Sequence, residues 1–127
     1  MVSYAATTEG ITIAVRPVYL DGESEALGGR FVFAYFVRIE NDAHGEVQLL
    51  RRHWIITDST GKRTEVEGEG VVGEQPVLAP GDVHEYQSFC VLETFTGTME
   101  GSYLMQRENG ERFRAQIPRF HLAARAN

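Results

Sequence analysis

The sequence is poor in cysteine and lacks long apolar runs, and both absences limit what the protein can be. Cys90 is the single cysteine, so an internal disulfide is excluded, as expected in a reducing cytoplasm. No apolar run approaches about 20 residues, so no membrane partner or membrane span is expected. Residues 1–10 lack the basic start and apolar run of a signal peptide. These features predict a cytoplasmic protein.

Basic residues are outnumbered by acidic ones. The chain carries 12 Lys and Arg residues and 18 Asp and Glu residues, a net charge of −6. Such a chain repels phosphate backbones, so nucleic acid is not an expected partner. Residues 101–127 differ, with five basic and two acidic side chains. We interpret these arginines as protection of an edge strand against aggregation, with an acidic partner as the alternative.

Catalytic motifs are also missing. No Ser/His/Asp or Cys/His arrangement with a known motif is present. The histidines show no metal-site spacing; they are His44, His53, His84 and His121. The apolar run 88–92 around Cys90 favours a buried, unreactive thiol. The sequence therefore predicts no enzymatic activity and no cofactor.

What the sequence does contain is strand periodicity. Its 127 residues, 43% of them hydrophobic, are enough for a single domain over residues 1–127 with its own core. Apolar and polar residues alternate with the period of two that strands require. Seven segments show it: 11–20, 30–41, 48–58, 63–69, 84–93, 98–107 and 112–120. We predict an all-β fold, an antiparallel β-sandwich of about seven strands.

Some positions predict local departures from this pattern. Pro17 lacks an N–H, which predicts an edge strand or a bulge. Arg51, Arg52 and His53 interrupt the alternation before Trp54, and a bulge there would reset the register. Asn109-Gly110 is typical of a hairpin turn. Residues 121–127 are expected to fray.

Residues 70–82 are too rich in glycine and proline for a helix or a long strand. Leu78-Ala79-Pro80-Gly81 followed by Tyr86 is similar to the corner of fibronectin type III and immunoglobulin-like sandwiches, although the spacing from Leu78 to Tyr86 is longer than in fibronectin domains. In that corner a tyrosine hydroxyl bonds to backbone just upstream. We therefore expect the Tyr86 hydroxyl to make such a bond.

Gly68, Gly70 and Gly73 match the G-x-G-x-x-G pattern of dinucleotide-binding loops. That chemistry needs a following helix, and Pro76 argues against one. Glu69 and Glu74 also bring charge of the wrong sign for phosphate. We interpret the glycines as a connection that crosses between the sheets, and a weak pyrophosphate site helped by Arg51 or Arg52 as the alternative.

Charged side chains surround this connection. Glu65, Glu67 and Glu69 share one strand face, which predicts a solvated row or, as an alternative, a site for a hard cation such as Mg²⁺. Arg51 and Arg52 are expected to pair with Glu67 or Glu69 across the hairpin, or to stack on Trp54. Binding of an anion or a partner's carboxylate is the alternative.

Residues 51–81, RRHWIITDSTGKRTEVEGEGVVGEQPVLAPG, resemble the signature of the bacterial ApaG family, and so do segments 86–88, 97–103 and 117–120. The resemblance implies a fibronectin type III-like fold and a poorly defined biochemical activity. It also implies a genetic link to cobalt tolerance and magnesium efflux.

Residues and resemblance together favour a non-enzymatic protein–protein interaction module with an unknown protein partner, as a monomer or a weak homodimer. An ion-binding role in Mg²⁺ and Co²⁺ homeostasis is the alternative, and weak nucleotide binding is the third reading. The expected contact surface consists of Arg51, Arg52, His53, Gly68, Gly70, Gly73 and Glu74.

Overall fold

The computed structural model describes residues 3–125, and these form nine strands joined by turns and two short 3-10 segments. The strands are β1 (Tyr4–Thr8), β2 (Ile11–Tyr19), β3 (Phe31–Asn41), β4 (Val47–Asp58), β5 (Arg63–Glu69), β6 (Val77–Leu78), β7 (Val83–Leu92), β8 (Thr96–Arg107) and β9 (Arg112–Ala123). The 3-10 segments η1 (Asp21–Glu23) and η2 (Ala26–Gly28) lie between β2 and β3. In this part of the chain no helix has the length and apolar character needed to cross a bilayer.

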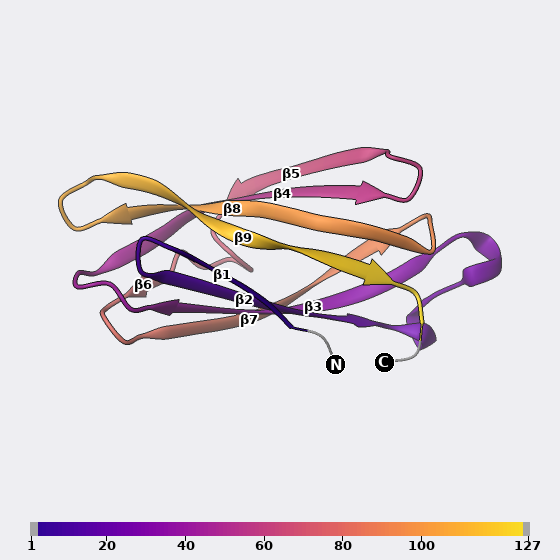
Figure 1. The fold of residues 1–127 in the computed structure, drawn as a ribbon, viewed down its shortest axis with the longest axis horizontal. Coiled ribbons are helices and arrows are strands. Elements are labelled where there is room, and N and C mark those ends of the chain that lie inside the picture. The colour runs from indigo at the N-terminus through magenta and orange to yellow at the C-terminus, as the bar shows by residue number, and fades with distance from the viewer. Residues whose placement is uncertain (1–2, 126–127) are drawn as a thin grey trace.

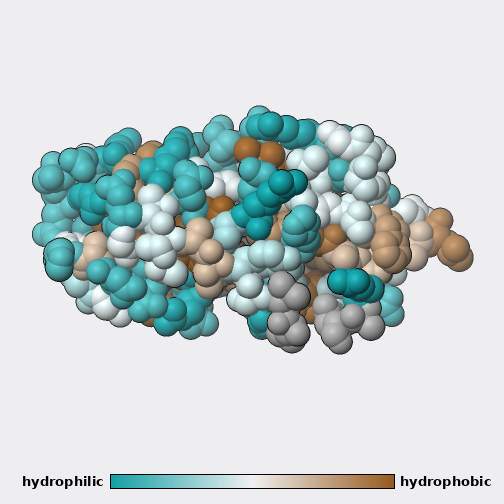
Figure 2. Space-filling model, viewed as in Figure 1, coloured by the Kyte–Doolittle hydropathy of each residue, from teal (hydrophilic) through white to brown (hydrophobic). Residues whose placement is uncertain are grey.

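The strands form two antiparallel sheets that pack as a sandwich (Figure 1). One sheet has the order β1-β2-β3-β7, and the other has the order β5-β4-β8-β9, with β6 paired to β4. The sandwich is closed where β1 meets β9, and there the Gln116 amide donates to Thr8 Oγ1 at 3.1 Å. Hydrophilic residues cover much of the face shown in Figure 2. The predicted all-β sandwich is confirmed.

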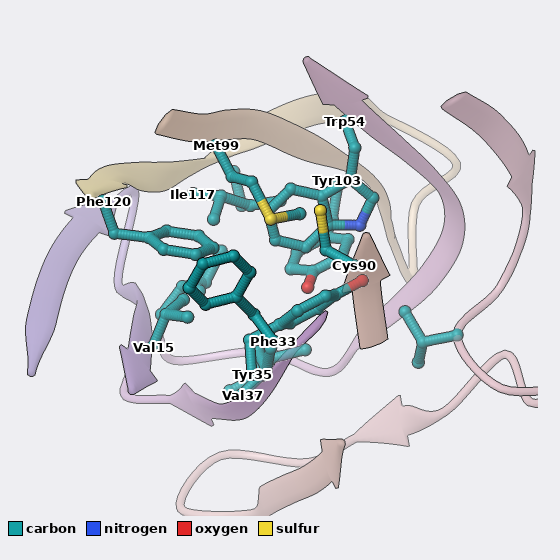
Figure 3. Packing of buried hydrophobic residues seen from close by; sticks show 14 of the residues in the cluster. Val15, Phe33, Tyr35, Val37, Trp54, Cys90, Met99, Tyr103, Ile117 and Phe120 are labelled. Carbon is teal, nitrogen blue, oxygen red and sulfur yellow. The ribbon is translucent and has the colours of Figure 1, made fainter. Parts of the chain in front are cut away.

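Period-two burial builds the core between the sheets (Figure 3). In β2 it buries Ile11, Ile13 and Val15, and from β4 it buries Trp54. The Trp54 ring packs 5.2 Å from the Tyr35 ring centroid, and the Phe120 and Tyr103 rings stand edge-on to it at 6.0 and 6.3 Å. Edge-to-face contacts of this kind suit aromatic quadrupoles, so the tryptophan anchors both sheets.

All seven predicted strands are present, but the sequence analysis missed β1 and β6. Both are short, and their sequences, YAATT and VL, give no strong alternation. The predicted frayed tail is wrong for residues 121–124, because β9 continues to Ala123 and both Leu122 and Ala124 are buried. The Ala124 amide also donates to the Phe95 carbonyl at 2.9 Å. The last two residues of that tail lie outside the described residues.

Pro17 sits in a strand that is internal over only part of its length. β2 pairs with β3 throughout, including Pro17 opposite Tyr35, whereas its pairing with β1 ends at Val15 opposite Tyr4. Among residues 3–125 no strand therefore pairs with the other side of Pro17, as the predicted edge position requires, and the missing N–H leaves no gap in the described β1 ladder.

Cys90 is buried on the inner side of β7 and is a free thiol. Burial raises its pKa to about 11. The predicted burial is confirmed, and the raised pKa disfavours the nucleophilic thiolate.

Gly101 marks the tightest approach between β4 and β8. A Cβ added there would lie 2.0 Å from the His53 carbonyl oxygen. We expect Gly101→Ala to lower the free energy of unfolding by about 3 kcal/mol, because the backbone must shift to relieve this overlap. Urea denaturation measures the change. Gly22→Ala is the control, because no atom lies within 4 Å of its added Cβ; equal stability of the two variants would contradict this packing.

Candidate functional site

A β-bulge in β4 sets the geometry of the predicted contact surface. The pairing with β8 passes from Leu49 opposite Met105 to Arg51 opposite Leu104, so Leu50 is an extra residue. Val47 and Leu49 face the core before the bulge, and Trp54 is buried after it. The predicted bulge is confirmed. It places Arg52 on the core side of β4 and Arg51 on the outer side, so the predicted surface is divided between two faces.

The outer face carries His53 with the glutamates of β5. His53 Nε2 lies 3.2 Å from Glu65 Oε1 and 4.0 Å from Glu67 Oε1. The Arg63 guanidinium, followed by His53, holds the pKa of the exposed Glu65 carboxyl below its usual range. The expected pairing across the hairpin therefore exists, but His53 makes it, while Arg51 lies opposite Glu69 in the register. Exposed pairs of this kind add little stability.

This arrangement offers little to a metal ion. Within residues 3–125, no group of three His, Cys, Asp or Glu side chains is placed to hold one. Glu65 already accepts hydrogen bonds from Arg63 and His53, and every glutamate of β5 is exposed. The cation site at Glu65, Glu67 and Glu69 therefore remains a prediction from the sequence.

Arg52 lies on the core side and holds the end of β5. Its Nη1 donates to the carbonyl oxygens of Glu69 at 3.0 Å and Gly70 at 3.1 Å. A Cβ at position 68 would lie 2.8 Å from Arg52 Nη2, so Gly68 makes room for the guanidinium. Cation–π contacts in the described chain join Arg16 to Phe36 and Arg107 to Phe113, so the predicted stacking on Trp54 is not the arrangement found.

Residues 70–76, which we call the glycine loop, fill the space beside the bulge. β5 and β6 both pair with β4, and the loop connects them along the same sheet edge. The Leu50 carbonyl accepts from the Gly70 amide and from Gln75 Nε2, each at 2.9 Å, and the Leu49 amide donates to the Pro76 carbonyl at 3.0 Å. The bulge and the loop thus satisfy each other's backbone groups, which fixes the loop's position.

The loop tip is a two-residue turn closed by two backbone hydrogen bonds. The amides of Val71 and Glu74 donate to each other's carbonyls at 2.8 and 3.0 Å. Val72 and Gly73 occupy the turn with φ of 47° and 79°, as a type I′ turn requires. Val71 is buried, whereas Val72 is 65% exposed. A β-branched residue in the left-handed region is strained, so the tip holds an exposed apolar side chain in a costly conformation.

The same bonding disfavours a nucleotide site. The amides of Gly70, Val71 and Glu74 already donate within the protein, and strand β6 follows the loop where a dinucleotide site needs a helix. Gly70 has φ of 62°, and a Cβ there would lie 2.2 Å from the Glu74 carbonyl oxygen. Gly70 therefore serves the loop's own close packing, and Gly73 serves the turn at its tip.

The structure corrects where the chain crosses between sheets. The glycine loop stays at one sheet edge, and the crossing comes later, between β6 and β7. Buried Asn41 secures it: its Nδ2 donates to the Leu78 carbonyl at 2.9 Å, and its carbonyl accepts from the Gly81 amide at 2.7 Å. Proximity in sequence gave no signal of this, because Asn41 and Leu78 are 37 residues apart.

The expected tyrosine corner is wrong. The Tyr86 hydroxyl bonds to the hydroxyl of Tyr103. Tyr86 is on the core side of β7 and points across the sandwich to β8, away from the upstream backbone. Burial raises the pKa of both tyrosines, so the pair remains protonated.

His84 is a residue of the site that the sequence analysis missed. Its Nε2 is buried and has no hydrogen-bond partner among the described residues, and Glu74 Oε2 lies 3.8 Å away. Glu74 thereby connects the glycine loop to the other sheet. His84 and Glu74 belong to different segments, and no spacing motif links them.

Comparison with known proteins supports the resemblance seen in the sequence. A model of the ApaG domain matches residues 21–107. Protein ApaG of Paramagnetospirillum magneticum is 52% identical over 119 residues, covering 94% of this chain and 92% of that protein. Protein ApaG of Anaeromyxobacter dehalogenans is 50% identical over 117 residues, covering 92% of each. A crystal structure described as an ApaA protein from Bordetella pertussis superposes with a TM-score of 0.87 at 47% identity, covering 89% of this chain and 92% of that one.

Because Arg52 donates to the Glu69 and Gly70 carbonyls, substitutions of Arg52 and of the adjacent Arg51 should differ in their effect on stability. Arg52→Met should lower the free energy of unfolding by about 2 kcal/mol, because hydrogen bonds from a charged donor to two carbonyls are lost. It should also speed hydrogen exchange at the Gly70 and Val71 amides. Arg51→Met, on the exposed outer face, is the matched control and should change neither. Similar effects of the two substitutions would contradict the assignment of faces.

The glutamate row of β5 can be tested directly. We expect neither Mg²⁺ nor Co²⁺ to shift or locally broaden the amide NMR signals of residues 64–74. Glu65 is already paired, and the glutamates of β5 are open to solvent. A saturable change confined to these residues, lost in Glu67→Gln, would instead establish the cation site.

Proposed function

The chain belongs to the ApaG family, and from this premise we propose that it acts as a non-enzymatic protein–protein interaction module in the cytoplasm. The proposed contact surface is the glycine loop, with Val72 at its tip. The partner is a protein that offers an apolar contact to this side chain.

Val72 is the observation that carries the proposal. A left-handed conformation costs a β-branched residue about 1–2 kcal/mol, and asparagine or glycine would fit the turn better. The side chain gains little within the fold, since it is 65% exposed. Strain retained at an exposed apolar residue is typical of a binding site, where contact with another molecule offsets the local cost.

The fixed position of the loop also supports binding. Arg52, the β4 bulge and the closed turn hold Val72 in place before any partner arrives. A preorganised loop loses little conformational entropy on association, so its contacts contribute more fully to affinity. Val77, 50% exposed in the adjacent β6, extends the apolar area.

The buried titratable groups support binding over catalysis. Burial raises the pKa of Cys90, Tyr86 and Tyr103, which disfavours their reactive, ionised forms. Catalytic nucleophiles and bases require pKa values near the working pH. The raised pKa values of these three groups therefore support recognition over catalysis by them.

Val72→Asn should separate stability from binding. We expect the variant to be about 1 kcal/mol more stable, because asparagine tolerates the left-handed region, and to capture fewer partner proteins. Thermal unfolding and affinity capture from native lysate, with partners identified by mass spectrometry, measure the two effects.

Leu27→Asn is the matched control, since it removes an exposed apolar side chain in η2 and should leave capture unchanged. Unchanged capture by folded Val72→Asn would overturn the proposed surface.

A further inference from the structure

Within the described residues the two sheets have five edge strands, and four of these carry features that block pairing with another chain; β6, for one, has only two residues. β1 is only five residues long. β5 bears three glutamates and Arg63, and β9 bears three arginines and Pro118. Short length, charge and proline are the usual protections of a sheet edge.

β7 is the least protected of these edges, with Glu85 as its one carboxylate. Its ten residues contain no lysine, arginine or proline, and its register with β3 runs without a bulge from Val83 to Leu92. In the described part of the chain, its backbone pairs with β3 alone, so the other side of the strand presents free N–H and C=O groups. Phe89 is 59% exposed, Val91 51% and Val83 39%, all on its outer face.

The sandwich is also open beside β7. β5 lies at the corresponding edge of the other sheet, and its core-side Val66 is 39% exposed, although the neighbouring Trp54 is buried. Ile56, Thr64 and Val91 help line a hollow of about 100 Å³ between these edges. A strand added to β7 would extend its sheet over Val66 and this hollow.

We propose that β7 binds an extended segment of a partner protein, in which apolar residues alternate with lysine or arginine, as a fifth strand of its sheet. The inference deepens the proposed interaction function by adding a second surface and the chemistry of its occupant. Main-chain hydrogen bonds would supply affinity, and the apolar side chains of the added strand, on its inner face, would cover Val66 and the neighbouring hollow.

Charge specifies the basic character of the occupant. Residues 77–106 contain no lysine or arginine, and Asp82 and Glu93 flank β7 while Glu85 lies within it. Lysine or arginine on the outer face of the added strand would lie beside Glu85 and near Glu93, which favours association and register.

The same charges disfavour a second copy of this chain as the occupant. In a two-fold antiparallel pairing centred on Gln87, Val83 would lie opposite Val91. Glu93 of one copy would then lie beside Asp82 of the other at both ends of the ladder. Like charges placed side by side in this way destabilise the pairing.

The test uses the full chain and a capped ten-residue peptide of alternating valine and lysine. We expect the peptide to slow hydrogen exchange at alternate β7 amides at least tenfold, because those facing away from β3 gain acceptors. The same peptide N-methylated at its four central amides, or with glutamate replacing lysine, should give no protection.

Phe89→Lys and Val91→Lys should each weaken peptide binding at least tenfold by adding charge to the edge. Leu27→Lys is the control for an exposed apolar residue elsewhere and should bind normally. Val72→Asn should also bind normally, which separates this strand from the glycine loop, so failure here would leave the glycine-loop proposal standing.

Absence of β7 protection, or equal protection by the N-methylated peptide, would overturn the inference. Concentration-dependent protection of β7 without peptide, with dimers in sedimentation, would overturn the assigned occupant in favour of a second copy.

Discussion

One extra residue in β4 determines how this family member presents its surface. With Leu50 inserted, Trp54 enters the core and Arg52 points to the same side, while Arg51 and His53 turn outward. The displaced Leu50 carbonyl then needs donors, and the Gly70 amide and Gln75 side chain provide them. The bulge and the glycine loop are therefore one structural unit, because each leaves backbone groups that the other satisfies.

This unit explains why the glycines are needed without any ligand. Gly68 leaves room for the Arg52 guanidinium, and Gly70 allows the chain to pass the Glu74 carbonyl. The result is a rigid loop whose tip exposes Val72. The proposed recognition through this loop and through the free edge of β7 would suit a small sandwich, in which the sheets form a scaffold for edges and connections.

The sequence was sufficient for the fold and for part of the site. Alternation of apolar and polar residues located the long strands, and the interruption at residues 51–53 indicated the bulge. The sequence did not show which arginine faces the core, because the face on which each residue of β4 lies depends on where the extra residue is inserted. Nor did it show that Glu74 meets His84, or that Tyr86 bonds Tyr103. Those contacts depend on how the two sheets are stacked, which no local pattern encodes.

The hydrogen bond between the Gly70 amide and the Leu50 carbonyl is the most direct test of this account. Scalar coupling across that bond can be measured by NMR between the Gly70 nitrogen and the Leu50 carbonyl carbon. We predict a resolved coupling comparable to that of the Arg107 amide with the Glu111 carbonyl in the β8–β9 hairpin. A resolved coupling in the hairpin, with none between Gly70 and Leu50, would contradict the claim that the bulge and the glycine loop form one hydrogen-bonded unit.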